Sequence, residues 1–173
     1  SLNYEIEKWD NGDTILPTAV SNCIFWVKAD AGVIRSGSYV TNWMDQSGMG
    51  YHVTNRSGNT TLSTNIMNLN RQSALTFNGS SYMFTSYNFD AIKKYTILAV
   101  SRYTGGDNER VVASRDRNWL FGFHGNADAR FYAEGWIYQG GSGNTNWHMH
   151  TGTINDDPDP KASFWKDGLL LAN

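Results

Sequence analysis

Hydrophobic and polar residues alternate in short runs along this chain, and the period of about 3.6 residues that marks amphipathic helices is nearly absent. The clearest run is WLFGFH at 119–124, which places Trp119, Phe121 and Phe123 on one face of a strand and Leu120 and His124 on the other. Similar runs, rich in β-branched and aromatic residues, predict further strands at 23–28, 74–78, 81–85, 95–103, 110–114, 129–134, 147–154 and 162–166.

Clusters of Gly, Asn, Asp and Ser separate these runs, notably at 78–81, 104–108, 124–128 and 139–144. Near the end, Asp167-Gly168 predicts a tight turn into one more strand. Many short strands separated by turn sequences predict an all-β fold, an antiparallel two-sheet jelly-roll β-sandwich. The strand at 95–103 has apolar or small residues on both faces, which predicts a central position in its sheet.

Residues 1–20 begin with a polar stretch and contain Pro17, unlike the strand-rich remainder of the chain. We therefore predict one such domain over 21–173, preceded by an N-terminal arm at 1–20. The strand that follows the Asp167-Gly168 turn simply stops at Asn173. An unpaired strand edge has to be covered in a stable sandwich. We therefore expect either that the sandwich lacks its last strand or that another element covers this edge.

Charge and composition narrow the classes of partner. The formal net charge is −2, from 14 basic and 16 acidic residues, so we expect no nucleic-acid partner. No apolar run approaches the roughly 18 residues of a membrane span, so we expect no membrane insertion. Only 17% of residues are charged while Asn, Ser, Thr and Gly are abundant, which suits neutral partners such as sugars. Cys23 is the one cysteine, so no intrachain disulfide can form.

The order of several spaced motifs resembles that of a known superfamily. The matching residues are Trp26, Ala29 and Asp30; Trp43, Asp45, Ser47, Gly48, Gly50 and His52; 74–79 (ALTFNG); and 164–168 (FWKDG). With these, the chain from about residue 23 onward resembles the concanavalin A-like lectin/glucanase superfamily, and more narrowly the laminin-G-like jelly-roll domains of bacterial and phage surface proteins. The resemblance implies an adhesion or binding module on an extracellular, cell or virion surface.

A second resemblance concerns the arm. Trp9, Gly12, Asp13 and Ile15 are similar to the opening of some phage tail and fibre proteins, which implies an attachment segment. The alternative is an ordinary polar arm that pairs as a strand.

Catalysis is not expected. An enzyme of the glucanase branch would need two carboxylates on one strand face, one as nucleophile and one as general acid. The branch's E-x-D-x-x-E pattern is absent, and Asp107 and Glu109 lie in a turn sequence. We therefore predict no catalytic residues and a chain that is not an enzyme.

Carbohydrate binding is the positive hypothesis, because a sugar needs an exposed aromatic platform together with Asn, Asp and Arg side chains. Residues 115–147 hold that mixture, with Trp119 and Arg130 among them, and 135–147 is the most ligand-like stretch. Strand alternation predicts that Trp136 and Tyr138 share a face; the alternative is that these aromatics belong to the core. The ligand-binding candidates are Arg115, Arg117, Asn118, Tyr132, Trp136, Tyr138, Asn144, Asn146 and Trp147.

No cofactor is required by the sequence, and metal sites are weak candidates. Asp156, Asp157 and Asp159 could supply oxygen ligands to calcium, although an acidic surface loop is the favoured interpretation. His148 and His150 share a strand face and are expected to face solvent.

The favoured function is a non-catalytic carbohydrate-binding module of a larger surface protein, whose partner is a glycan or a glycosylated surface. The first alternative is a phage capsid, tail or fibre decoration domain that packs against other virion or surface-protein subunits. The second alternative is a glycan hydrolase.

Overall fold

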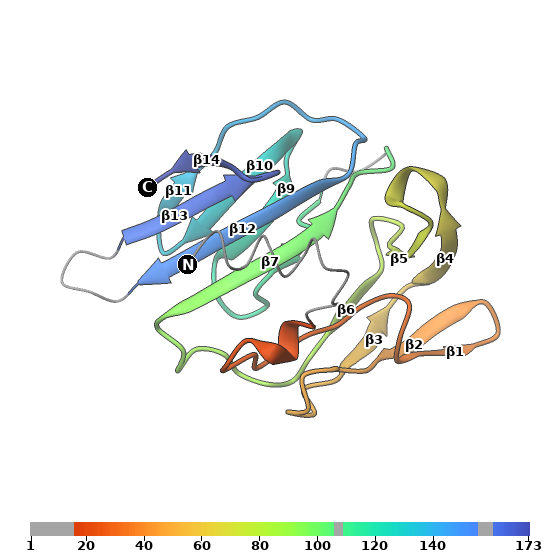
Figure 1. Ribbon diagram of the computed structural model, residues 1–173. Coiled ribbons are helices and arrows are strands. Elements are labelled where there is room, and N and C mark those ends of the chain that lie inside the picture. Colours follow the sequence, from red (N-terminus) through yellow and green to blue (C-terminus); the bar gives the residue numbers. More distant parts are fainter. Residues whose placement is uncertain (1–15, 106–108, 156–160) are drawn as a thin grey trace, which may run out of the picture. The chain divides into compact units, whose positions relative to one another are not determined.

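The computed structural model describes residues 16–105, 109–155 and 161–173, apart from the side chain of Lys161 (Figure 1). This part of the chain consists almost entirely of antiparallel strands, which confirms the predicted all-β class. Its helices are two single 3₁₀ turns, η1 (Pro17–Ala19) and η2 (Met67–Leu69), and neither could span a membrane. The chain divides into two compact units, Ser1–Tyr87 and Asn88–Asn173.

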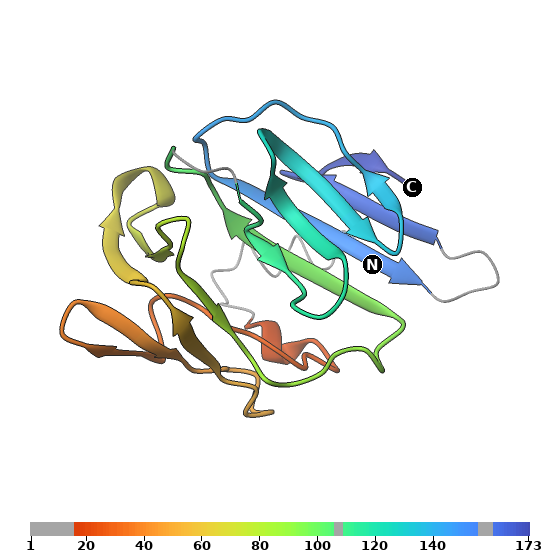
Figure 2. The same ribbon diagram turned by 180° about the vertical axis from the view of Figure 1, so that it is seen from behind.

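The first unit is a single six-stranded sheet (Figure 2). Its strands run in the order β5-β4-β2-β3-β6, and β1 also pairs with β2. Their bounds are β1 (Val33–Ser36), β2 (Tyr39–Trp43), β3 (Val53–Ser57), β4 (Thr61–Ile66), β5 (Gln72–Thr76) and β6 (Tyr82–Phe84). The first four strands escaped the sequence prediction because polar runs such as VTNRS and TLSTNI carry no clear alternation.

The predicted strand at 23–28 is wrong. Of these residues, Lys28 alone forms a bridge, with Ala31, and the rest follow an irregular path. Their backbone groups bond to the loop after β2 instead: Trp26 N–H donates to Asp45 Oδ1 at 3.0 Å, and Trp26 C=O accepts from Gln46 N–H at 2.6 Å. Because this loop satisfies the backbone groups of Trp26, the segment does not need a ladder partner.

Asp45 is the hub of that loop. Its buried carboxylate accepts hydrogen bonds from the backbone N–H groups of Trp26, Ser47 and Tyr51 and from the Ser47 hydroxyl. Gly48 and Gly50, at φ 92° and 76°, allow the chain to curl around it. Burial raises the pKa of Asp45, but these hydrogen bonds outweigh burial and hold the pKa below its usual value. The WMDQSGMG segment is therefore an architectural turn.

The second unit is a sandwich of two four-stranded sheets, in the orders β11-β10-β9-β8 and β14-β13-β12-β7. The strand bounds are β7 (Tyr95–Ser101), β8 (Val112–Ala113), β9 (Trp119–His124), β10 (Ala127–Ala133), β11 (Trp136–Tyr138), β12 (His148–Asn155), β13 (Lys161–Lys166) and β14 (Leu169–Ala172). Asp167 and Gly168 both have positive φ, 51° and 80°, as a type I′ turn requires, so the predicted final hairpin is confirmed.

The core of this unit forms where the two sheets meet. Phe121 and Phe131 come from β9 and β10, Phe164 comes from β13, and all three are fully buried. Phe121 lies edge-on to both neighbours, with ring centroids 5.2 Å from Phe131 and 5.6 Å from Phe164. Gly152 on β12 lets the sheets approach, because a Cβ there would lie 2.7 Å from the Phe121 ring. Of the residues predicted to share one face of 119–124, Phe121 lies in this core and Trp119 packs against it.

Strand β7 lies at the end of its sheet, so the predicted central position is wrong. Ile97 and Ala99 pack against the core, whereas Leu98 and Val100 remain 63% and 56% exposed. A strand that is apolar on both faces therefore has one face outside this core. The predicted strand at 110–114 is also shorter than expected, since β8 contains just Val112 and Ala113.

We expect Asp45→Ala to lower the free energy of unfolding by about 3 kcal/mol, because it leaves several partly buried N–H donors without an acceptor. Asp30→Ala is the matched control, since it removes an exposed carboxylate whose pairing with Lys28 contributes about 0.5 kcal/mol or less. Urea unfolding of both variants measures the difference. Equal stability of the two would contradict the hub role of Asp45.

A second expectation concerns His150, whose pKa is lowered first by burial, with the positive charge of His148 adding to that effect. Because the unfolded state takes up this proton more readily, the free energy of unfolding should fall as the pH drops below about 6.5. His150→Gln keeps an N–H donor for the Asp128 carbonyl but cannot titrate, so the pH dependence of its unfolding in urea should be flatter. An unchanged pH dependence in this variant would rule out His150 as the source.

Candidate functional site

A β-bulge decides which aromatic side chains face outward. In the β10–β11 pair, Tyr132 lies opposite Trp136, but the adjacent Phe131 lies opposite Tyr138. Residues directly opposite each other share a face of the sheet. Trp136 and Tyr138 therefore point to opposite faces, and the prediction that they form one platform is wrong. The extra residue, Ile137 in β11, breaks the simple alternation that the prediction assumed.

Tyr138 belongs to the core of the second unit. Its ring centroid lies 5.8 Å from that of Phe164, and Gly140 packs closely against the ring. The alternative given for the strand aromatics, packing in the core, holds for this residue. Its position against the core makes it a structural side chain.

Trp136 and Tyr132 form an outward aromatic pair. Their ring centroids are 5.1 Å apart and the rings are nearly perpendicular, at 83°. The guanidinium of Arg130 lies 5.6 Å from the centre of the Trp136 ring, a cation–π distance. Trp136 is 43% exposed, so part of its ring is open to a ligand.

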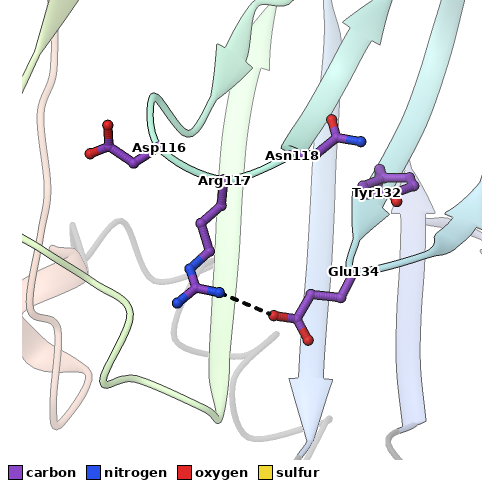
Figure 3. Close-up of a pocket in the computed structure, with 5 residues that line it drawn as sticks. All are labelled: Asp116, Arg117, Asn118, Tyr132 and Glu134. Carbon is purple, nitrogen blue, oxygen red and sulfur yellow. Dashed lines mark ion pairs between the residues drawn. The ribbon is translucent and has the colours of Figure 1, made fainter.

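A shallow cavity of about 250 Å³ lies beside this pair (Figure 3). The loop that leads into β9 and the end of β10 line it with Asp116, Arg117, Asn118, Tyr132 and Glu134. Hydrogen bonds stabilise the conformation of the loop: Arg117 N–H donates to Ser114 Oγ, and Trp119 N–H donates to Arg117 C=O at 2.9 Å. Glu134 follows the last residue of β10 and has φ 57°, a left-handed conformation. Arg117, Asn118 and Tyr132 were sequence candidates, and the structure brings these three together.

Ion pairs hold the charged groups of the cavity. Arg117 Nε donates to Asp90 Oδ2 at 3.0 Å, and its Nη1 lies 3.8 Å from Glu134 Oε1, the pair drawn in Figure 3. The hydrogen bond to Asp90 raises the pKa of the Arg117 guanidinium. Two carboxylates thus already compensate this cation. A ligand at the cavity does not need to bring charge of its own.

Asp116 is turned away from Glu134 (Figure 3). Arg115 holds it through two hydrogen bonds of 2.9 and 3.1 Å, which lower the pKa of the Asp116 carboxyl. Both side chains are well exposed, so this pair orients Asp116 more than it stabilises the fold. Asn118 is oriented in a similar way, because its Oδ1 accepts from Arg110 Nη2 at 3.0 Å.

The structure does not gather the remaining candidates at this cavity. Asn144 bonds to Asp128 and His148, and its Oδ1 also accepts from the backbone N–H of Asn146. The ring of Trp147 lies 4.9 Å from the guanidinium of Arg102. Arg115 borders the cavity only through Asp116. Asp116, Glu134 and Asp90 were not predicted as site residues, because a carboxylate in a turn sequence carries no indication of the cation with which it pairs in the fold.

Two expectations about histidines and metals remain. His150 is fully buried and His148 nearly so, so the expectation that both face solvent is wrong. They do share a face, with ring centroids 6.2 Å apart. Asp156, Asp157 and Asp159 lie outside the described residues. Within 16–105, 109–155 and 161–173, no three His, Cys, Asp or Glu side chains are placed to hold a metal ion.

Comparison of the chain with family models, with curated proteins and with solved structures found no match. The laminin-G-like resemblance therefore stays a prediction, and the geometry of the site carries the argument about function.

Because the bulge places Trp136 and Tyr138 on opposite faces, removal of each side chain should lower the free energy of unfolding by a different amount. Tyr138→Ala should lower the free energy of unfolding by about 3 kcal/mol, because it leaves a cavity against Phe164. Trp136→Ala should cost about 1 kcal/mol or less, the contribution of a surface aromatic pair. Urea denaturation compares them, and a larger loss in Trp136→Ala would contradict the assigned faces.

Proposed function

We propose that this chain is a non-catalytic glycan-binding module that engages sugar on the outer face of β10 and β11. The observation that carries the proposal is the outward Tyr132–Trp136 pair, in which Trp136 is exposed and Tyr132 lines the cavity. The aromatic rings supply a π face for the C–H groups of a pyranose ring. The neighbouring amide, guanidinium and carboxylate supply donors and acceptors for its hydroxyls.

The charge balance supports a neutral sugar as the ligand. Arg117 faces Asp90 and Glu134, so no uncompensated cation of the cavity calls for an acidic sugar. Asn118 adds an amide whose N–H donors can reach a hydroxyl group. The ion pairs also hold the side chains in place before binding, which lowers the entropy cost of association.

The size of the cavity supports recognition of a single sugar residue. About 250 Å³ lies just below the usual range of small-molecule pockets, roughly 300–1,000 Å³. A shallow site of this size binds weakly by itself. Several copies presented on one surface would raise the effective affinity through avidity.

The orientation of the carboxylates supports binding without hydrolysis. Glycoside hydrolysis needs two carboxyl groups that flank the bond to be cleaved. Here Glu134 faces Arg117, while Asp116 points away and is held by Arg115 (Figure 3). The resemblance to laminin-G-like domains supports placing the module in an extracellular, cell-surface or virion-surface protein.

The second candidate is a structural role against other subunits of a virion or surface protein. Leu98, Thr151, Trp165 and Leu170 lie directly opposite one another across β7, β12, β13 and β14, so they share one face of that sheet. Leu98 and Leu170 are 63% and 49% exposed. Exposed apolar side chains in a row favour contact with another protein.

A glycan array followed by a tryptophan-fluorescence titration tests the binding proposal. We expect hits among neutral glycans, and Trp136→Ala should weaken the best hit at least about tenfold, which corresponds to about 1.4 kcal/mol. Tyr82→Ala is the matched control, because it removes an aromatic side chain of the first unit that is 53% exposed. An array with no hit among neutral, acidic or amino sugars would contradict the proposal and favour the structural role.

A further inference from the structure

A polar cluster around a buried carboxylate joins the two sheets of the second unit, away from the cavity. Asp128 on β10 is 4% exposed, and its Oδ2 receives hydrogen bonds from Asn144 Nδ2 at 2.6 Å and from Lys166 Nζ at 3.0 Å. Asn144 lies in the loop before β12, and Lys166 ends β13. One carboxylate oxygen therefore contacts both an amine and a carboxamide nitrogen from separate segments.

The carbonyl of the same carboxamide is also engaged. His148 Nε2 lies 3.0 Å from Asn144 Oδ1, and His148 Nδ1 lies 2.6 Å from Asp167 Oδ2. Asp167 is itself held by the backbone N–H of Met149 at 2.9 Å. When Nε2 of His148 carries a proton, it donates to Oδ1 and polarises the Asn144 carbonyl, as a donor in an oxyanion hole does.

These contacts assemble a nucleophile, an electrophile, a proton carrier and a polarising donor. We propose that Lys166 and Asn144 form an intramolecular isopeptide bond, with Asp128 moving the protons and His148 stabilising the developing oxyanion. The bond would tie the loop before β12 to the end of β13. It would add a covalent link to a chain whose one cysteine allows no intrachain disulfide.

The step balances without an oxidant or a cofactor. Lys166 Nζ passes a proton to Asp128 Oδ2, and the neutral amine attacks Asn144 Cγ to form the new C–N bond. Asp128 returns a proton to Asn144 Nδ2 as the Cγ–Nδ2 bond breaks. Ammonia leaves and takes up the remaining proton, so a lysine ammonium and a carboxamide become a secondary amide and an ammonium ion.

Burial favours this chemistry over a permanent ion pair. Asp128 Oδ1 is buried and has no hydrogen-bond partner among the described residues, and Lys166 is 24% exposed. A buried charge with incomplete hydrogen bonding costs free energy, so this pair is costly as a permanent ion pair. The fold also holds the reacting groups together, which replaces a bimolecular encounter by a unimolecular step.

Intact mass spectrometry of the denatured full chain tests the proposal. We expect a mass lower than that of the sequence by one ammonia, and loss of tryptic cleavage after Lys166, because trypsin does not cut after an acylated lysine. Tandem spectra should identify a branched peptide that contains both Asn144 and Lys166. Lys166→Arg and Asn144→Ala should each restore the full mass, whereas the matched control Lys93→Arg should keep the loss of ammonia.

Asp128→Asn separates chemistry from folding, because it keeps both reacting residues but removes the proton carrier. This variant should show the full mass together with an unchanged far-ultraviolet circular dichroism spectrum. A wild-type chain of full mass would overturn the proposal without any variant. It would also be overturned by ammonia loss that maps to the Asn78-Gly79 sequence, or by water loss that links Lys166 to Asp128. None of these readouts depends on glycan binding.

Discussion

The contact between the two sheets of the second unit is the constraint on which its other features depend. Phe121 and Phe131 from one sheet meet Phe164 from the other, and Gly152 leaves the space that their rings fill. Packing at this density leaves little freedom for the strands to shift in register. The outward positions of β10 and β11 are thereby fixed, and so are the side chains that line the candidate site.

The two polar features of this unit differ in how they are held. At the cavity, ion pairs between exposed groups such as Arg117 and Asp90 orient side chains and contribute little to stability. At Asp128 the carboxylate is buried and its partners are partly buried, so each hydrogen bond matters more and an unpaired oxygen is costly. The first arrangement suits a surface that exchanges ligands. The second suits a fixed internal link between strands.

Much of the fold could be predicted from local pattern. The 119–124 run and the Asp167-Gly168 turn appear as expected, because alternation and turn chemistry depend on neighbouring residues alone. By contrast, 23–28 has strand composition but is not a strand, because a distant carboxylate and loop take its backbone hydrogen bonds. Composition carries no record of such long-range competition.

The sequence by itself determined the all-β class, the position of the main turns and the aromatic–polar mixture of residues 115–147. The tertiary structure decided which of those residues meet. A bulge between β10 and β11 sent Trp136 outward and Tyr138 inward, and sheet packing buried His150 and placed Lys166 beside Asp128. Strand patterns specify the local alternation of faces, whereas contacts between strands far apart in the chain depend on register, which is set only when the core packs.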